Sequence, residues 1–143
     1  MRRQRRGIVG VLLLVIAVGL LSRRFPLPGV FAEHTGDALY ATAAFCLFAL
    51  LAPAARGTSL AAAAFLFAAA IEMSQLLTWP WLQELRATRV GALCLGQGFV
   101  FADLPAYGVG ALLGLLLDYI FWHGSTRAPS PLDRLPHSPP PRT

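Results

Sequence analysis

The feature of this sequence that most constrains its fold is a set of four apolar runs long enough to cross a lipid bilayer. They cover about residues 7–22, 36–52, 58–78 and 104–122. At about 1.5 Å per residue, a helix of roughly 20 residues spans the hydrocarbon layer. A backbone in lipid must also satisfy its own hydrogen bonds, which favours helices. We therefore predict an all-α membrane protein with four transmembrane helices.

The composition agrees with this prediction and excludes other classes. Hydrophobic residues make up 56% of the chain and charged residues only 13%, which is not typical of a soluble domain. The net charge of +5 comes from arginines near the ends of the apolar runs, so it indicates membrane topology, and no nucleic-acid binding is predicted. Cys46 and Cys94 lie in apolar surroundings without metal-ligand spacing, so we predict no cofactor and no metal site.

The first apolar run has two interpretations. A basic cap, residues 1–6, precedes the uncharged residues 7–21, a pattern that also occurs in cleaved signal peptides. Arg23 and Arg24 follow the run almost at once, and the small residues before them make a poor cleavage site. We therefore expect a retained transmembrane helix.

Three connecting segments carry predictions of their own. Residues 25–36 contain two prolines and are predicted to be an irregular interfacial loop, with Asp37 capping the second helix. Residues 79–89 are predicted to be a short loop. Residues 90–102 hold three glycines and are too short to span, so we expect a re-entrant or interfacial segment before the last helix. Residues 124–143 contain six of the eleven prolines and are predicted to be a disordered tail.

The arginine distribution predicts the orientation of the helices. With four spans and the amino terminus inside, eight of the twelve arginines lie on the cytoplasmic side. We therefore expect a multi-pass inner-membrane protein with both termini in the cytoplasm. Trp79, Trp81, Tyr119 and Trp122 lie at run ends and are expected to be interfacial anchors.

One helical face of the third run carries small residues that lead to two polar ones. Its members recur every three or four residues: Ala61, Ala64, Ala68, Glu72 and Gln75. Small residues allow a neighbouring helix to approach closely, so this face should deliver Glu72 and Gln75 into the protein interior. Gly110 and Gly114 form a GxxxG pair in the last run, which predicts a second close helix contact.

The predicted topology gathers eight polar side chains at the outer ends of the helices, and they form the candidate site. They are Asp37, Tyr40, Glu72, Gln75, Arg86, Arg89, Asp103 and Tyr107. In one interpretation they only hold the helices together, with Asp37 and Asp103 as helix caps and Glu72 paired with Arg86 or Arg89. In the other, the two arginines bind a phosphate or carboxylate of a lipid headgroup or lipid-linked sugar.

An enzyme is the main alternative to a binding protein. Glu72 or Asp103 would then act as general base. We predict no catalytic residue, because the three histidines are scattered and the sequence holds no nucleophile motif. A pore or transporter is a third alternative. It would need an oligomer, because four short helices enclose little space.

Several motifs give the chain a resemblance to a known family. They include Gly36-Asp37-Ala38-Leu39-Tyr40-Ala41, Glu72 with Gln75-Leu76, Trp81-Leu82 with Arg86, and Asp103-Leu104 with Ala106-Tyr107 and Gly110. In this order they resemble the domain of unknown function 2809, a group of small bacterial membrane proteins, over about residues 24–118. The pattern is also distantly similar to VanZ-like proteins, which are associated with glycopeptide resistance. The resemblance implies the fold and the outer-face residues, and it implies no reaction.

Overall fold

The structure is a computed structural model that describes residues 4–25, 30–96 and 98–123, and every regular element in these ranges is a helix. The elements are α1 (Arg5–Arg24), α2 (Val30–Leu51), α3 (Gly57–Ser74), α4 (Pro80–Ala87), α5 (Arg89–Leu95) and α6 (Asp103–Asp118), which continues into a π-helical turn, Tyr119–His123. Four helices, α1, α2, α3 and α6 with its extension, are long and apolar enough to cross a membrane. The predicted all-α fold with four transmembrane helices is thus confirmed. The tail predicted at 124–143 lies outside the described residues.

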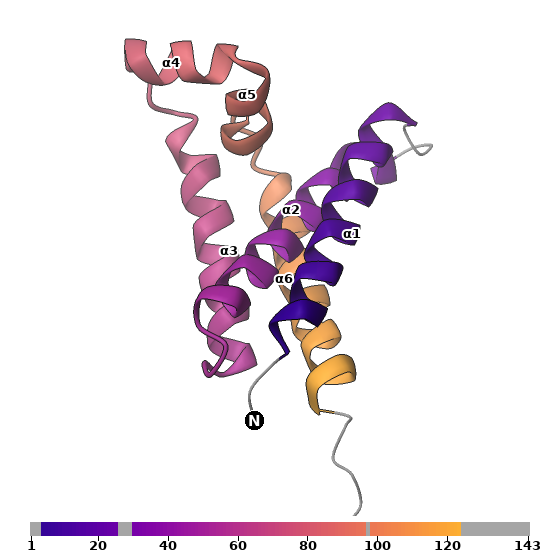
Figure 1. Cartoon of the computed structure of the whole chain (residues 1–143). Helices are drawn as coiled ribbons and strands as arrows, with labels where there is room; N and C mark the ends of the chain where they lie inside the picture. The colour runs from indigo at the N-terminus through magenta and orange to yellow at the C-terminus, as the bar shows by residue number, and fades with distance from the viewer. Residues whose placement is uncertain (1–3, 26–29, 97, 124–143) are drawn as a thin grey trace, which may run out of the picture.

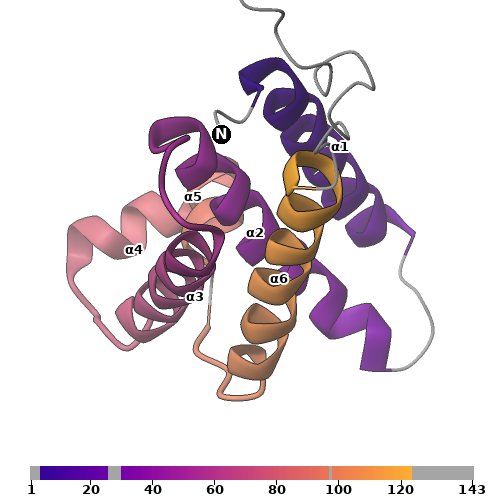
Figure 2. The same cartoon turned by 90° about the horizontal axis from the view of Figure 1, so that it is seen from below.

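The long helices form a bundle with α2 at its centre. α2 packs against α1, α3 and α6, and α3 also packs against α6. Seen from below, α3 lies on one side of α6 and α1 on the other (Figure 2). α4 lies across the end of α3, and α5 turns back toward the long helices (Figure 1). The start of α1 and the end of α6 lie together at the opposite end of the bundle (Figure 1).

Small residues bring the central helices together, as their spacing predicts. Ala61, Ala64 and Ala68 are buried on α3, on the same face as the buried Glu72. On α6, a Cβ atom at Gly110 would collide with the carbonyl oxygen of Ala38, and one at Gly114 would lie 2.6 Å from Cγ of Phe45. The GxxxG pair is therefore the contact surface of α6 with α2.

The hydroxyl of Thr42 adds a polar tie between α2 and α6. Its Oγ1 lies 2.9 Å from the carbonyl oxygen of Ala38 and 2.9 Å from that of Gly110 on the facing helix. Thr42 is fully buried, so this hydrogen bond is shielded from water and from lipid. It fixes the register of the two helices just below the candidate site.

The beginning of α2 differs from the sequence prediction. The helix starts at Val30, so Asp37 lies in its second turn and is not a helix cap. Gly36 does not interrupt the helix, because an interior glycine costs only about 1 kcal/mol of helix propensity and packing contacts can offset that. The predicted irregular loop over 25–36 is therefore wrong from Val30 onward.

The segment after α3 also differs from the prediction. α3 ends at Ser74, and the amides of Leu76 and Leu77 bond three residues back in tighter turns. Trp79 is extended, as a residue before proline prefers to be, and Pro80 opens α4. Residues 80–87 therefore form a helix where a loop was predicted.

Candidate functional site

Glu72 is the centre of the site and is held by uncharged donors. Its side chain is only 1% exposed. Oε1 accepts a hydrogen bond from the Val100 amide at 2.6 Å. Oε2 accepts two, from the Tyr107 hydroxyl and from Nε2 of Gln75, both at 2.9 Å. Three hydrogen bonds offset much of the cost of burying a carboxylate in a membrane protein.

A backbone turn after α5 brings the Val100 amide to Glu72. Gly96 has a φ of 69°, a value that favours glycine, and it lets the chain reverse at the end of α5. The turn passes so close to Gln75 that a Cβ atom at position 96 would collide with its amide group. Gly96, one of the three glycines that argued against a spanning helix in the sequence, therefore permits the return of the chain over Glu72.

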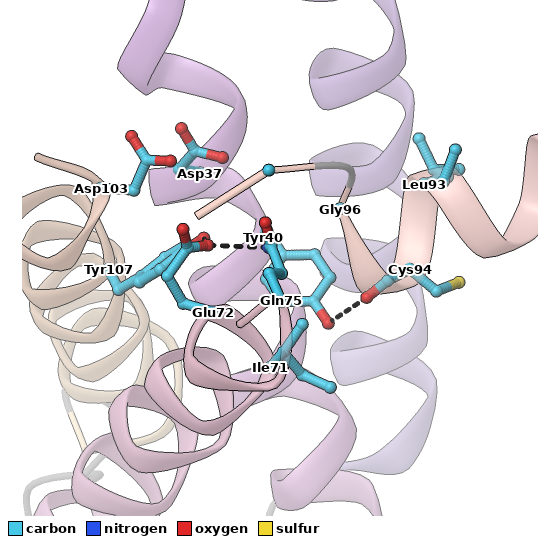
Figure 3. Close-up of a pocket in the computed structure, with 12 residues that line it drawn as sticks. Asp37, Tyr40, Ile71, Glu72, Gln75, Leu93, Cys94, Gly96, Asp103 and Tyr107 are labelled. Carbon is cyan, nitrogen blue, oxygen red and sulfur yellow. Dashed lines mark hydrogen bonds between the residues drawn. The ribbon is translucent and has the colours of Figure 1, made fainter. Parts of the chain in front are cut away.

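Six of the eight predicted site residues line one pocket of about 240 Å³. They are Asp37, Tyr40, Glu72, Gln75, Asp103 and Tyr107. Figure 3 shows Glu72 and Tyr107 together, with the carboxylates of Asp37 and Asp103 on one side of them. The Tyr40 hydroxyl donates a 2.8 Å hydrogen bond to the carbonyl oxygen of Cys94, which ties α5 to α2. Asp103 is the first residue of α6, with Pro105 in its first turn, and Ala102 is the N-cap.

Arg86 lies outside this pocket and does not pair with Glu72. Its side chain is 5% exposed and bonds the end of α3 instead. One guanidinium nitrogen, Nη2, donates to the carbonyl oxygen of Ser74 at 2.7 Å, and the other, Nη1, donates to that of Leu77 at 3.2 Å. The predicted ion pair is therefore wrong for Arg86, because the guanidinium donates instead to the carbonyl oxygens at and just beyond the end of α3.

Arg89 is also separate from the site. It is the first residue of α5 and its side chain is exposed. It is not among the described residues that line the pocket, and the described partners of Glu72 do not include it. The part of the sequence hypothesis that used two arginines to hold an anion is not supported by this arrangement.

The different positions of the two arginines lead to a matched prediction. Arg86→Leu removes the donors from two helix-end carbonyls and should lower the free energy of unfolding by about 2 to 3 kcal/mol. Arg89→Leu changes an exposed side chain and should alter it by less than about 0.5 kcal/mol. Reversible denaturation in detergent micelles measures both. Equal losses for the two variants would contradict the structural role of Arg86.

The polar pocket lies next to an apolar groove. The groove has a volume of about 490 Å³ and runs along α1 and α2. Pocket and groove share four lining residues, Tyr40, Ile71, Leu93 and Cys94. A polar chamber and an apolar channel with a common wall are suited to one molecule that has both a polar and an apolar part.

Sequence reasoning missed several contributors to the site. The Val100 amide and the Cys94 carbonyl are backbone groups, which no residue pattern identifies. His34 lies one turn before Asp37 on α2, and its Nδ1 is 3.2 Å from Oδ1 of Asp103. The spacing His34-x-x-Asp37 is visible in the sequence, but residues 25–36 were predicted to be a loop, so the two were not placed on one helical face.

A known protein family matches the part of the chain that contains the whole site. Residues 26–111, more than half of the chain, match the model of a family described as protein of unknown function (DUF2809). The matched segment contains α2 to α5, the first half of α6 and all six pocket residues named above. No solved structure matches the chain. The distant similarity to VanZ-like proteins stays a prediction. The chain belongs to the DUF2809 family.

Proposed function

We propose that this membrane protein binds an amphiphilic lipid, with the headgroup in the polar pocket and the hydrocarbon chain in the apolar groove. The proposal rests on the adjacency of the two spaces, which share four lining residues. A soluble polar ligand would need only the pocket, and an ordinary bilayer lipid would need only the groove. A molecule that uses both gains apolar contact and hydrogen bonds at the same time.

The chemistry of the pocket favours a headgroup with hydroxyl or amine donors. Its described lining contains three carboxylates, from Asp37, Glu72 and Asp103, and no basic side chain. Carboxylates accept hydrogen bonds from sugar hydroxyls or ammonium groups and repel phosphate. Among the ligands expected from the sequence, a lipid-linked sugar therefore fits better than a purely anionic headgroup.

The geometry favours binding over catalysis. A general base needs a free lone pair that can reach the proton of the substrate. The buried Glu72 carboxylate already accepts three hydrogen bonds from the protein, which take up most of its acceptor positions and make it a structural anchor. A role of Glu72 as general base would have to break this set of contacts.

The arginine count supports an orientation with the pocket at the outer face of the inner membrane and both termini in the cytoplasm. The lipids within reach would then be those of the outer leaflet and the lipid-linked precursors of the cell envelope. A reporter inserted in α4 should be active outside, and a cytoplasmic signal from that position would contradict this orientation.

Lipid retention tests the proposal directly. The protein is placed in nanodiscs that contain equal amounts of glucosyl diacylglycerol and phosphatidylglycerol, released into the gas phase and weighed by native mass spectrometry. We expect the glycolipid to be retained preferentially. Ala43→Phe, which fills the groove, should lower its retention roughly tenfold or more, equivalent to about 1.4 kcal/mol.

Leu112→Phe is the matched control. It adds an aromatic ring to an exposed position of α6 that is not among the described lining of the groove. Retention should be unchanged in this variant. Equal retention of both lipids, or equal effects of the two phenylalanines, would overturn the proposal.

A further inference from the structure

Three side chains with metal-binding atoms meet at the rim of the pocket. They are His34 and Asp37 on α2 and Asp103 on α6, and their ligand atoms all lie within 4.8 Å of one another. Nδ1 of His34 lies 3.2 Å from Oδ1 of Asp103, within hydrogen-bonding distance. The cluster combines one imidazole nitrogen with two carboxylates, so it is not simply a group of acidic residues.

The two helices hold this cluster in a fixed geometry. His34 and Asp37 are three residues apart on a helix, which places both on the same face. Asp103 faces them from the first turn of α6, and the close approach of the two helices at Gly110 fixes the separation. The ligand atoms therefore come from rigid elements and not from loops, which is a requirement for a precise metal site.

The separations suit a small divalent cation. Ligands about 2.1 Å from a tetrahedral zinc ion lie about 3.4 Å from one another, close to the separation of His34 from Asp103. Small rotations of the Asp37 carboxylate would bring the third ligand into place. The His34 and Asp103 side chains are 27% and 16% exposed, so water or a ligand can reach the remaining position.

We propose that His34, Asp37 and Asp103 bind one divalent transition-metal ion, with Zn²⁺ the best match to a set of one nitrogen and two oxygen ligands. The carboxylates of Asp37 and Asp103 lie side by side (Figure 3), so a single ion would contact both. Binding through Nδ1 requires that this nitrogen carry no proton, so the ring proton resides on Nε2. Asp37 and Asp103 also line the pocket, so the ion would lie at its edge.

The site was not predicted from the sequence, because its ligands are far apart in the chain. The spacing of the cysteines had indicated no metal site. Only the packing of α6 on α2 brings position 103 to position 34. The proposal does not depend on the lipid ligand, since it rests on protein atoms alone.

Titration of the chelator-treated full-length protein in detergent tests the site. Isothermal calorimetry with ZnCl₂ should show one ion per chain, and MgCl₂ should bind at least tenfold more weakly, because the imidazole favours zinc. Asp103→Asn should weaken zinc binding by tenfold or more, since even indirect partners of a metal ligand have effects of that size. Glu84→Gln, an exposed carboxylate on α4, is the matched control and should bind zinc as the wild type does.

X-ray absorption of the zinc-loaded wild type keeps the test decisive if the variants are unstable. We expect a shell of nitrogen and oxygen ligands with the scattering pattern of one imidazole. A sulfur ligand would assign the zinc to Cys46 or Cys94 and overturn the proposal. Zinc binding that Asp103→Asn leaves unchanged, or no binding at all, would overturn it too. When the lipid-retention experiment is repeated with a metal chelator present, the zinc site is empty, so failure of one proposal does not imply failure of the other.

Discussion

Replacing Gly110 with alanine should lower the free energy of unfolding by about 3 kcal/mol or more, at the upper end of the range for overpacked cores. The new Cβ atom would collide with the carbonyl oxygen of Ala38 and lie 2.9 Å from Cβ of Ala41. A flexible side chain could move aside, but a helix backbone cannot. α6 would have to move away from α2 and lose the buried hydrogen bond of Thr42 to the Gly110 carbonyl.

Gly108→Ala is the matched control on the same helix. A Cβ atom at position 108 meets nothing within 4 Å, so alanine there should stabilise the helix by up to about 1 kcal/mol. Denaturation in detergent micelles compares the two substitutions. Effects of the same sign and size would show that α6 does not pack on α2 through Gly110.

Glu72→Leu should cost about 3 kcal/mol or more, because it leaves three donors without their acceptor and each unsatisfied buried group costs about 1 to 3 kcal/mol. The loss should concentrate in the segment that returns from α5 to α6. Hydrogen exchange at the Val100 amide should therefore accelerate more than exchange in the middle of α3. Unchanged protection of that amide would contradict the anchoring role of Glu72.

Double-mutant cycles identify the partner of Glu72. The cycle of Glu72→Leu with Tyr107→Phe should show a coupling of about 1 kcal/mol or more, typical of groups in direct contact. The cycle with Arg86→Leu should show less than about 0.5 kcal/mol, because the two side chains bond different groups. Strong coupling to Arg86 would restore the ion pair that the sequence had favoured.

The spanning helices and the buried face of α3 follow from sequence because membranes impose strong and simple constraints. In lipid, a chain segment of this length satisfies its backbone hydrogen bonds as a helix. The face of α3 that carries the alanines and Glu72 is the face expected to pack against the other helices. The gathering of six polar residues at one end of the bundle also follows, since they occupy the same ends of α2, α3 and α6.

The structure of the segments between the spanning helices, and the contacts they make, could not be predicted in the same way. Pro80 opens a helix, and that helix carries Arg86 to the carbonyls at the end of α3, although charge alone favoured Glu72. Local charge counting ignores those carbonyls, which are always present at a helix end and need donors. His34 and Asp103 are 69 residues apart, so their contact depends on the approach of two helices and on no local pattern.

The position of the groove along α1 and α2 determines how a lipid would exchange with it. The groove is lined by the sides of helices that span the bilayer, so a hydrocarbon chain can move sideways between bilayer and groove without crossing water. The usual cost of about 0.8 kcal/mol for each exposed methylene then does not enter the barrier. Release is limited instead by the hydrogen bonds of the headgroup. The residence time should therefore be nearly independent of chain length and should change steeply with each hydroxyl that the headgroup gains or loses.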